Sequence, residues 1–273
     1  MFLFRMALKN LLRHKRRTLI TSLIIAFAIL IYILTDGLMI GLTDMSFRNI
    51  INLESGHLQI ANSDYWEERK ELPLKNLIIP SETLEEKIME LNGLKAYTKR
   101  LNFSVNLNNG IDELPVTGLG IDINNDKKVF ELEEHIMEGR MPEPDTKEII
   151  MGAQLAELMD FKVGSYAVML IRTEDKTFNT IDGEVVGLLN TPHPTLNENS
   201  VFIPLKSAQD RLDVGEKITH YAVRVQDQER GIAAAEELNQ KLENNIKAYA
   251  GNAGYRDSGD TGDNTDTGSS WSS

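Results

Sequence analysis

Hydrophobic residues are concentrated in one long stretch near the start of the chain. From Thr18 to Thr35, eighteen consecutive residues carry no formal charge, and after Asp36 the apolar stretch continues from Gly37 to Thr43. An α-helix rises about 1.5 Å per residue, so roughly 20 residues cross a hydrocarbon core of about 30 Å. This pattern predicts a transmembrane helix over residues 19–45.

Basic residues precede this stretch. Residues 1–18 contain six basic side chains and no acidic one, and Arg13, Lys15, Arg16 and Arg17 lie directly before the apolar residues. Positive charge is preferentially retained on the cytoplasmic side of a membrane. We therefore expect a cytoplasmic N-terminus, a helix in the lipid bilayer, and residues from 46 onward outside the cytoplasm.

A cleaved secretory signal and a buried soluble helix are two alternatives for the same stretch. The apolar region of a signal peptide has about 7–15 residues and ends in a small-x-small cleavage site. Here the run is longer and no Ala-x-Ala pattern follows it, while a buried soluble helix would leave the basic flank unexplained. A retained anchor is the preferred interpretation.

Gly37 and Gly41 form a Gly-x-x-x-Gly pair near the outer end of the predicted helix. Two small residues on one helix face let a second helix approach closely. One such pair often arises by chance, so a role in helix packing and no role at all are equally open at this level.

Residues 46–250 interleave two hydrophobic periods. Alternating apolar positions predict strands, and apolar positions three to four apart predict helices. The expected strands are 56–61, 105–107, 114–118, 149–151, 166–171, 183–189, 200–203 and 221–225. The expected helices start after Ser81 and cover 153–159, 205–212 and 229–242. Together these elements predict an α+β domain.

Each expected helix has a predicted buried face. The first would be capped by Ser81 and would bury Leu84, Ile88 and Leu91. The second would bury Leu155, Leu158 and Met159, and the last would present Ile232, Ala235, Leu238 and Leu242 on one side. The asparagine–glycine sequence at 108–110 predicts a hairpin turn.

The last 23 residues differ from the rest of the chain. Nineteen of residues 251–273 are Gly, Asp, Ser, Thr or Asn, without any apolar period. Such a segment cannot bury enough apolar surface to offset the entropy of ordering. It is expected to be disordered.

The charge balance excludes one class of partner. Six of the 29 basic residues lie before residue 18, so 41 acidic residues face 23 basic ones in the remainder, a net charge of −18. A strongly acidic body repels the phosphate backbone, which argues against nucleic acid. Cysteine is absent, so disulfide and thiol chemistry are excluded.

The sequence contains no pattern typical of a catalytic, cofactor or metal site. There is no Gly-Lys dipeptide and hence no phosphate-binding P-loop. The five histidines (14, 57, 135, 193 and 220) have no ligand spacing, and surface or strand-edge positions are expected for His57 and His220. We therefore expect that the protein is not an enzyme and holds no cofactor.

For three other segments we prefer a structural interpretation to a functional one. Gly118-Leu-Gly120 lacks the third glycine of a dinucleotide fingerprint and is expected to mark a strand end with a close backbone approach. Glu131–Glu134 is interpreted as a solvated face. Thr191-Pro-His-Pro194 is expected to be a rigid loop between strands, as a connector or a contact surface.

Several short motifs follow one another in an order typical of one family. The chain opens with Ala7-Leu-Lys-Asn-Leu-Leu-Arg-His-Lys-Arg-Arg-Thr18. It continues with Gly56-His-Leu-Gln-Ile60 and Tyr65, Gly139-Arg140, Ile149-Ile-Met-Gly-Ala-Gln-Leu-Ala156, Val163-Gly164, Val185-Val-Gly187 and Val201-Phe-Ile-Pro-Leu205. In this order, over residues 1–250, the chain resembles the FtsX-like ABC transporter permeases. That family includes lipoprotein-releasing (LolC/LolE-type) and MacB-type proteins.

The resemblance implies a domain plan. Its elements are a cytoplasmic basic N-terminus (1–18), the transmembrane helix (19–45), an extracytoplasmic MacB-like core domain (46–250) and the hydrophilic tail (251–273). The core domain would consist of a porter-like lobe with an inserted β-rich lobe at about residues 125–198.

The resemblance also implies a function. Such permeases hydrolyse nothing themselves, and couple ATP hydrolysis by a cytoplasmic ABC ATPase subunit to extracytoplasmic work such as lipoprotein release or export. The implied partners are that ATPase, a second permease subunit that is identical or different, and a lipoprotein or periplasmic adaptor. The implied location is the inner (cytoplasmic) membrane.

The sequence departs from the family after Ala250, where a second membrane helix is expected and none follows. The tail is therefore interpreted as a truncated, frameshifted or artificial end, and a chain of this form is not expected to transport alone. This leaves as an alternative a single-pass, membrane-anchored binding or scaffolding module that regulates an extracytoplasmic partner, such as a cell-wall hydrolase. An anchored hydrolase is disfavoured because no nucleophile, base and oxyanion hole assemble.

Overall fold

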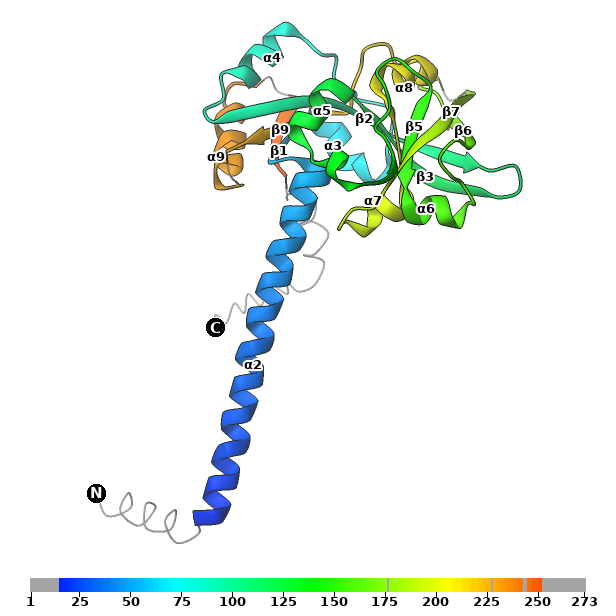
Figure 1. Cartoon of the computed structure of the whole chain (residues 1–273). Coiled ribbons are helices and arrows are strands. Elements are labelled where there is room, and N and C mark those ends of the chain that lie inside the picture. Colours follow the sequence, from blue (N-terminus) through cyan, green and yellow to red (C-terminus); the bar gives the residue numbers. More distant parts are fainter. Residues whose placement is uncertain (1–14, 176, 227, 243–244, 252–273) are drawn as a thin grey trace, which may run out of the picture. The chain divides into compact units, whose positions relative to one another are not determined.

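The computed structural model describes residues 15–175, 177–226, 228–242 and 245–251. It consists of two units, Met1–Arg48 and Asn49–Ser273 (Figure 1). The predictions for Arg13 and for the tail beyond residue 251 lie outside the described residues.

The first unit contains one long apolar helix. Helix α2 (Lys15–Ile50) is followed by a π-helical turn, η1 (Ile51–Ser55), in the second unit. Within the described residues, it is the one helix long and apolar enough to cross a membrane. No residue of its 18-residue apolar stretch is buried. Exposed side chains such as Leu23 and Leu34, both 64% accessible, are typical of a helix that faces lipid. The predicted N-terminal apolar helix is confirmed.

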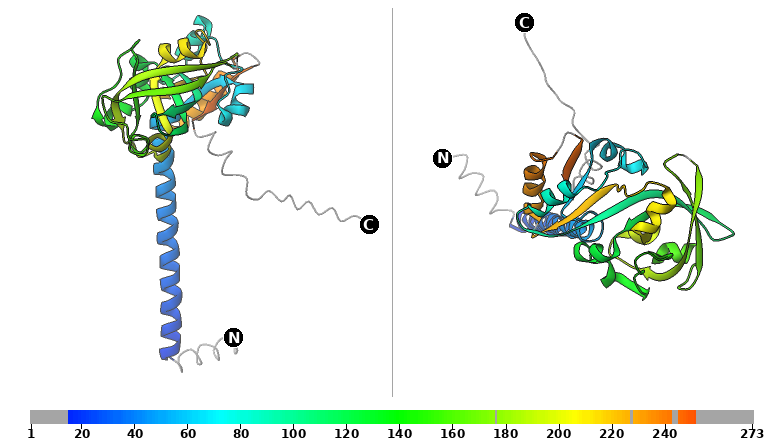
Figure 2. Two further views of the ribbon diagram at one scale, coloured as in Figure 1. Left: turned by 90° about the vertical axis from the view of Figure 1, so that its right-hand side faces the viewer. Right: turned by 90° about the horizontal axis from the view of Figure 1, so that it is seen from above.

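The second unit is built on a mixed sheet (Figures 1 and 2). In the described part of the chain this sheet is 10-stranded, with the order β10-β1-β9-β2-β3-β8-β5-β7-β4, and β6 pairs with both β2 and β7. Most pairs are antiparallel, while β3–β8 and β5–β7 are parallel. The strands are β1 (Leu58–Asn62), β2 (Leu94–Asn108), β3 (Glu113–Ile121), β4 (Ile136–Gly139), β5 (Glu148–Gly152), β6 (Tyr166–Arg172), β7 (Phe178–Leu189), β8 (Ser200–Pro204), β9 (His220–Val225) and β10 (Ile246–Ala250).

Short helices connect these strands and pack against them. They are α3 (Ser63–Glu68), η2 (Arg69–Glu71), α4 (Glu82–Met89), α5 (Ile123–Val129), η3 (Leu132–His135), α6 (Ala153–Leu158), α7 (Pro194–Asn199), α8 (Leu205–Leu212) and α9 (Gln228–Asn239). The predicted α+β class is therefore confirmed. The strands β4 and β10 and the helices α3, α5 and α7 were not predicted.

Local sequence explains several element boundaries. The side chain of Ser81 accepts a hydrogen bond from the amide of Leu84 and caps α4, whose residues Leu84 and Ile88 are buried. The β2–β3 hairpin pairs Asn108 with Glu113, and the Asn108 side chain accepts from the Gly110 amide within the turn. Both predictions are confirmed.

The predicted buried faces of α6 and α9 were wrong at one residue each. Leu158 is 69% exposed, whereas Leu155 is fully buried, and Ile232 is 41% exposed, whereas Leu238 is fully buried. A helix turns about 100° per residue. The buried residues Leu155, Ala156 and Met159 therefore centre on a direction roughly 105° away from Leu158. The apolar period was correct, but its phase was misjudged by about one position.

The positions predicted for His220 and Pro194 were also wrong. His220 is buried, at 4% exposure, in the interior strand β9, and does not occupy a surface or edge position. Pro194 is not part of a connecting loop, because it begins helix α7. The interpretation of Gly118-Leu-Gly120 as a strand end with a close backbone approach was wrong at Gly118, which lies inside β3, and a Cβ there would lie 2.5 Å from the side-chain ring of Phe103.

The largest hydrophobic cluster draws on a wider segment than the predicted inserted lobe. It includes Leu101 and Phe103 from β2 and Val201 and Leu212 from β8 and α8, together with β5–β7 residues such as Ile149. A second cluster gathers β1, β9, β10, α4 and α9. The lobe at about residues 125–198 stays a prediction.

Candidate functional site

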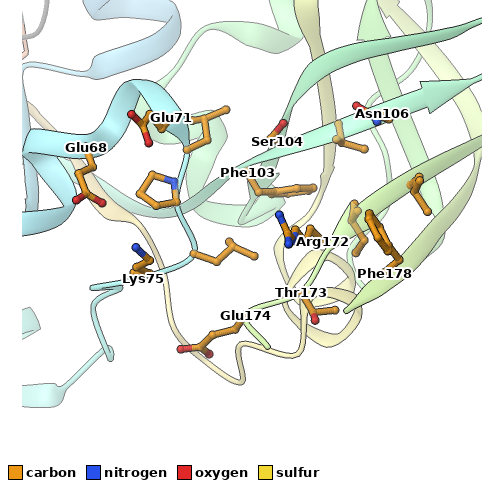
Figure 3. A pocket seen from close by; sticks show the side chains of 16 residues that line it. Glu68, Glu71, Lys75, Phe103, Ser104, Asn106, Arg172, Thr173, Glu174 and Phe178 are labelled. Carbon is orange, nitrogen blue, oxygen red and sulfur yellow. The ribbon is translucent and has the colours of Figure 1, made fainter. Parts of the chain in front are cut away.

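A groove of about 480 Å³ lies in the second unit between the segment after α3 and strands β2 and β6 (Figure 3). Glu68 at the end of α3 lines it together with Glu71 and Lys75 from that segment. Figure 3 shows Arg172 and Phe178 on the facing strands. Ordinary pockets for small ligands have volumes of about 300–1,000 Å³. The groove is therefore large enough for a small ligand or a few side chains of a partner.

The groove exposes both charge and an aromatic ring. Phe178, the first residue of β7, is 72% exposed. Arg172 ends β6 opposite Phe178 in the β6–β7 pairing, and its side chain is also exposed. An exposed aromatic residue beside an arginine is a common feature of protein interaction surfaces. The sequence analysis did not find this pair, because neither residue belongs to a motif.

A buried ion pair lies in the adjoining part of the sheet. The Arg100 side chain on β2 donates two hydrogen bonds of 2.9 Å to the two carboxylate oxygens of Asp126 on α5. A third guanidinium nitrogen donates to the backbone oxygen of Glu54 at 3.1 Å, and the guanidinium lies 3.5 Å from the Phe130 ring centroid. Arg100 thereby links η1 to β2 and α5.

A second polar cluster joins α4 to the sheet. The hydroxyls of Tyr97 and Tyr221 donate to the two carboxylate oxygens of Glu85, at 3.1 and 3.0 Å, and the Lys99 ammonium lies 2.7 Å away. Burial acts to raise the pKa of Glu85, but Lys99 and the two hydroxyls outweigh it, so this pKa is lowered. The cluster is typical of a structural link, because its contacts join α4 to β2 and β9.

The predicted topology and packing residues lie on the first unit. Lys15, Arg16 and Arg17 form the first turn of α2 and are exposed. Gly37 and Gly41 are one helical turn apart, and apart from the adjacent backbone of α2 itself, no atom of the described residues lies within 4 Å of where a Cβ would stand at either residue. Their roles stay predictions.

Metal binding finds no support among the residues that the structure describes. Within them, no group of three or more His, Cys, Asp or Glu side chains is placed to hold an ion. Nor do the described side chains combine a nucleophile, a base and oxyanion donors in the groove, which has carboxylates, a lysine and an arginine but no histidine.

Comparison with protein families is decisive for the second unit. The family described as MacB-like periplasmic core domain matches residues 18–241. The chain belongs to this family. It therefore carries a periplasmic domain of the ABC transporter permease type, as the sequence resemblance implied. Among curated proteins, none is similar enough in sequence to match the chain.

A solved structure agrees with the family assignment at the level of fold. The chain is similar to the periplasmic region of MacB from Actinobacillus actinomycetemcomitans, with 14% identity, a TM-score of 0.53, and coverage of 78% of this chain and 97% of that one. It also matches the extracellular domain of the noncanonic ABC-type transporter YknZ from Gram-positive bacteria. That match has 13% identity, a TM-score of 0.47, and covers 70% of this chain and 98% of the other. One apolar helix before a domain of this family is the arrangement of a membrane-anchored protein with an extracytoplasmic domain.

Proposed function

We propose that this MacB-like chain is part of a permease subunit that couples ATP hydrolysis by a cytoplasmic ABC ATPase to extracytoplasmic work such as lipoprotein release or export. The observation that carries the proposal is the family match, which begins within the apolar helix at residue 18 and runs through the domain to residue 241. The chain itself hydrolyses nothing and needs no cofactor. Its partners are the ATPase, a second permease subunit, identical or different, and a lipoprotein or periplasmic adaptor.

The proposed location is the inner membrane with a cytoplasmic N-terminus. Lys15, Arg16 and Arg17 at the start of α2 support this orientation, together with Arg13 in the sequence before it. The absence of cysteine makes the orientation directly testable, because any introduced thiol is the only one in the chain. A membrane-impermeant maleimide should label Glu133→Cys in intact spheroplasts and Asn10→Cys only after permeabilisation. The opposite labelling pattern would refute the orientation.

Coupling is tested by co-purification from the native membrane. The tagged chain, solubilised in mild detergent, should retain an ABC ATPase subunit that is identified by mass spectrometry. If an extracytoplasmic protein is retained without any ATPase, the alternative of an anchored scaffolding module takes the place of the permease proposal. A control with the tag on an unrelated single-pass protein identifies non-specific ATPase carry-over.

Gly37 and Gly41 are proposed to pack against a helix of the second permease subunit. The backbone is accessible at both residues, which supports close approach by another helix. Replacing both by Leu should abolish co-purification of the second subunit. Thr35→Leu with Met39→Leu is the matched control, because that pair has the same spacing on a face about 160–200° away. Equal loss in both double variants would contradict the proposal.

A further inference from the structure

Strand β6 has an apolar outer face that the described part of the chain leaves exposed. Residues 166–171 are all apolar, and burial alternates along the strand. The side chains that point inward, into the largest hydrophobic cluster, are Ala167, Met169 and Ile171. On the outer face, Tyr166 is 60% and Val168 is 44% exposed. A continuous apolar run is typical of a strand that is covered on both faces, whereas a strand with one solvated face usually has polar side chains there. The sequence of β6 therefore indicates a partner on its outer face.

The same outer face extends from β6 onto β7. Phe178 pairs with Arg172 and Glu184 pairs with Tyr166, so these side chains lie on one face of the sheet. Arg172 and Phe178 also line the groove described above, which makes the groove one end of this face (Figure 3). We call this surface the β6–β7 face, and its outward side chains are Tyr166, Val168, Leu170, Arg172, Phe178, Thr180, Asp182 and Glu184.

The β6–β7 face has a positive end and a negative end. Arg172 lies at one end, and Glu184 lies about 20 Å away along the strands at the other. Within the described residues, neither of these two side chains forms an ion pair or a side-chain hydrogen bond. Arg140 interacts electrostatically with Glu184, but its guanidinium nitrogens donate to the carboxylate of Glu148. Both ends of the face are therefore available to a charged partner.

A second copy of the same face is complementary to this pattern. When two copies pack face to face with antiparallel strands, a two-fold axis crosses β6 at Met169. Val168 then lies over Leu170 of the second copy, so apolar side chains cover each other. Arg172 lies over the opposite end of β6 of the second copy, about one strand spacing of 4.8 Å from its Glu184. An interface between identical patches repeats each contact, so both ion pairs form at once.

We propose that the β6–β7 face binds the same face of a second copy of this chain, with Arg172 of each copy paired with Glu184 of the other. The contact does not depend on the ATPase coupling proposed above. A patch of two strands is smaller than the roughly 800 Å² per partner of a standard interface. Association is therefore expected to be weak between isolated domains and to require the shared membrane, which raises the effective concentration of the two copies.

The absence of cysteine allows a direct test with the full chain in its native membrane. Val168→Cys places a single thiol close to the two-fold axis. A short bis-maleimide should link two such chains into a dimer, because packed sheets lie about 10 Å apart. Thr180→Cys, on the neighbouring strand, should give the same product. The matched control is Asn92→Cys, an exposed residue in the turn before β2, which should give little dimer.

Charge reversal tests the two ion pairs in the Val168→Cys background. Arg172→Glu brings two carboxylates together at each contact, and Glu184→Arg brings two guanidinium groups together. Each variant should lower the crosslinked fraction about fivefold or more, because like charges at an interface are strongly unfavourable. Lys95→Glu, an exposed charge outside the face, should leave it unchanged.

Co-expression of the two reversed variants with different tags provides the decisive measurement. One copy then has two carboxylates on its face and the other has two guanidinium groups, so both contacts are attractive again. The mixed dimer should recover a crosslinked fraction within about twofold of the parent. An effect within one chain cannot produce this recovery, because the two reversals lie on different chains.

Several results would overturn the proposal. These are no dimer with either cysteine on the face, an equal yield with Asn92→Cys, a crosslink to a different protein identified by mass spectrometry, and no recovery in the mixed dimer. Circular dichroism of the purified chains establishes that each variant is folded, and Thr180→Cys replaces Val168→Cys if the latter is not. A chain that co-purifies an ATPase but gives no crosslink would refute this contact and leave the permease proposal intact.

Discussion

Arg100 and Asp126 form a bidentate ion pair inside the second unit, with both nitrogen–oxygen distances at 2.9 Å. The two residues are 1% and 2% exposed, so neither charge is solvated. Arg100 also donates to the backbone oxygen of Glu54 in η1, the turn directly after α2. A buried ion pair contributes little net stability compared with apolar residues, but the loss of one partner leaves an unpaired buried charge.

Asp126→Asn should therefore lower the free energy of unfolding by about 3 kcal/mol or more, because the Arg100 charge loses its counter-ion. Urea unfolding of the full chain in detergent, followed by the fluorescence of Trp66 in a Trp271→Phe background, measures this change. The matched control is Asp182→Asn, which disrupts solvent-accessible pairs with Lys147 and Arg211 and should cost about 0–1 kcal/mol. Similar losses for the two variants would contradict a buried, unscreened pair. The double variant Arg100→Met with Asp126→Leu should recover part of the loss.

Gly118→Ala should destabilise the β2–β3 hairpin by about 1–3 kcal/mol, because overpacking forces side chains or backbone to shift. A Cβ at this residue would lie 2.5 Å from two ring carbons of Phe103. Thermal unfolding detected by circular dichroism is the measurement. Phe103→Leu removes the ring, so the double variant should cost less than the sum of the single variants. Additive losses would show that Phe103 does not cause the constraint.

Helix α6 allows a comparison of two leucines three residues apart. Leu155→Ala should cost about 2–5 kcal/mol, because its side chain is fully buried in the largest cluster. Leu158→Ala should cost less than about 0.5 kcal/mol, because this side chain is 69% exposed. Both variants are compared by urea unfolding. A large loss at Leu158 would show that the sequence-based assignment of the buried face was correct after all.

His220 should make the second unit sensitive to acid. Its pKa is about 3 in the folded chain, through burial and the charge of Arg100, against an ordinary value of 6.5. Between pH 6.5 and pH 3, His220 is protonated in the unfolded chain but neutral in the folded chain. The free energy of unfolding therefore has its full value above pH 6.5 and decreases as the pH falls towards 3. The slope reaches about 1.4 kcal/mol per pH unit.

Between pH 7 and pH 5 this effect amounts to about 2 kcal/mol. His220→Gln carries no titrating group, so its unfolding free energy should fall by about 2 kcal/mol less than that of the parent over the same interval. Urea unfolding at the two pH values measures both differences. Identical pH dependence of parent and variant would mean that His220 titrates normally in the folded chain.

Local interactions and long biases in composition were predictable from the sequence. The apolar helix, the hairpin at Asn108 and the capping of α4 by Ser81 each depend on interactions within a few residues or on a long composition bias. The ordered family motifs add up in the same way, over residues 1–250. Helix phase was less secure, as Leu158 and Ile232 show, because apolar side chains occur on both sides of α6 and α9.

The sequence by itself determined that the chain begins with an apolar helix after a basic flank and continues as an acidic α+β domain with a permease-like motif order. Only the tertiary structure decided which polar residues meet. Arg100 pairs with Asp126 and lies opposite His220 across β2 and β9, contacts that join residues 26 and 120 positions apart. Their alignment depends on strand register and on the packing of α5 over the sheet, and neither leaves a period or a motif in the sequence.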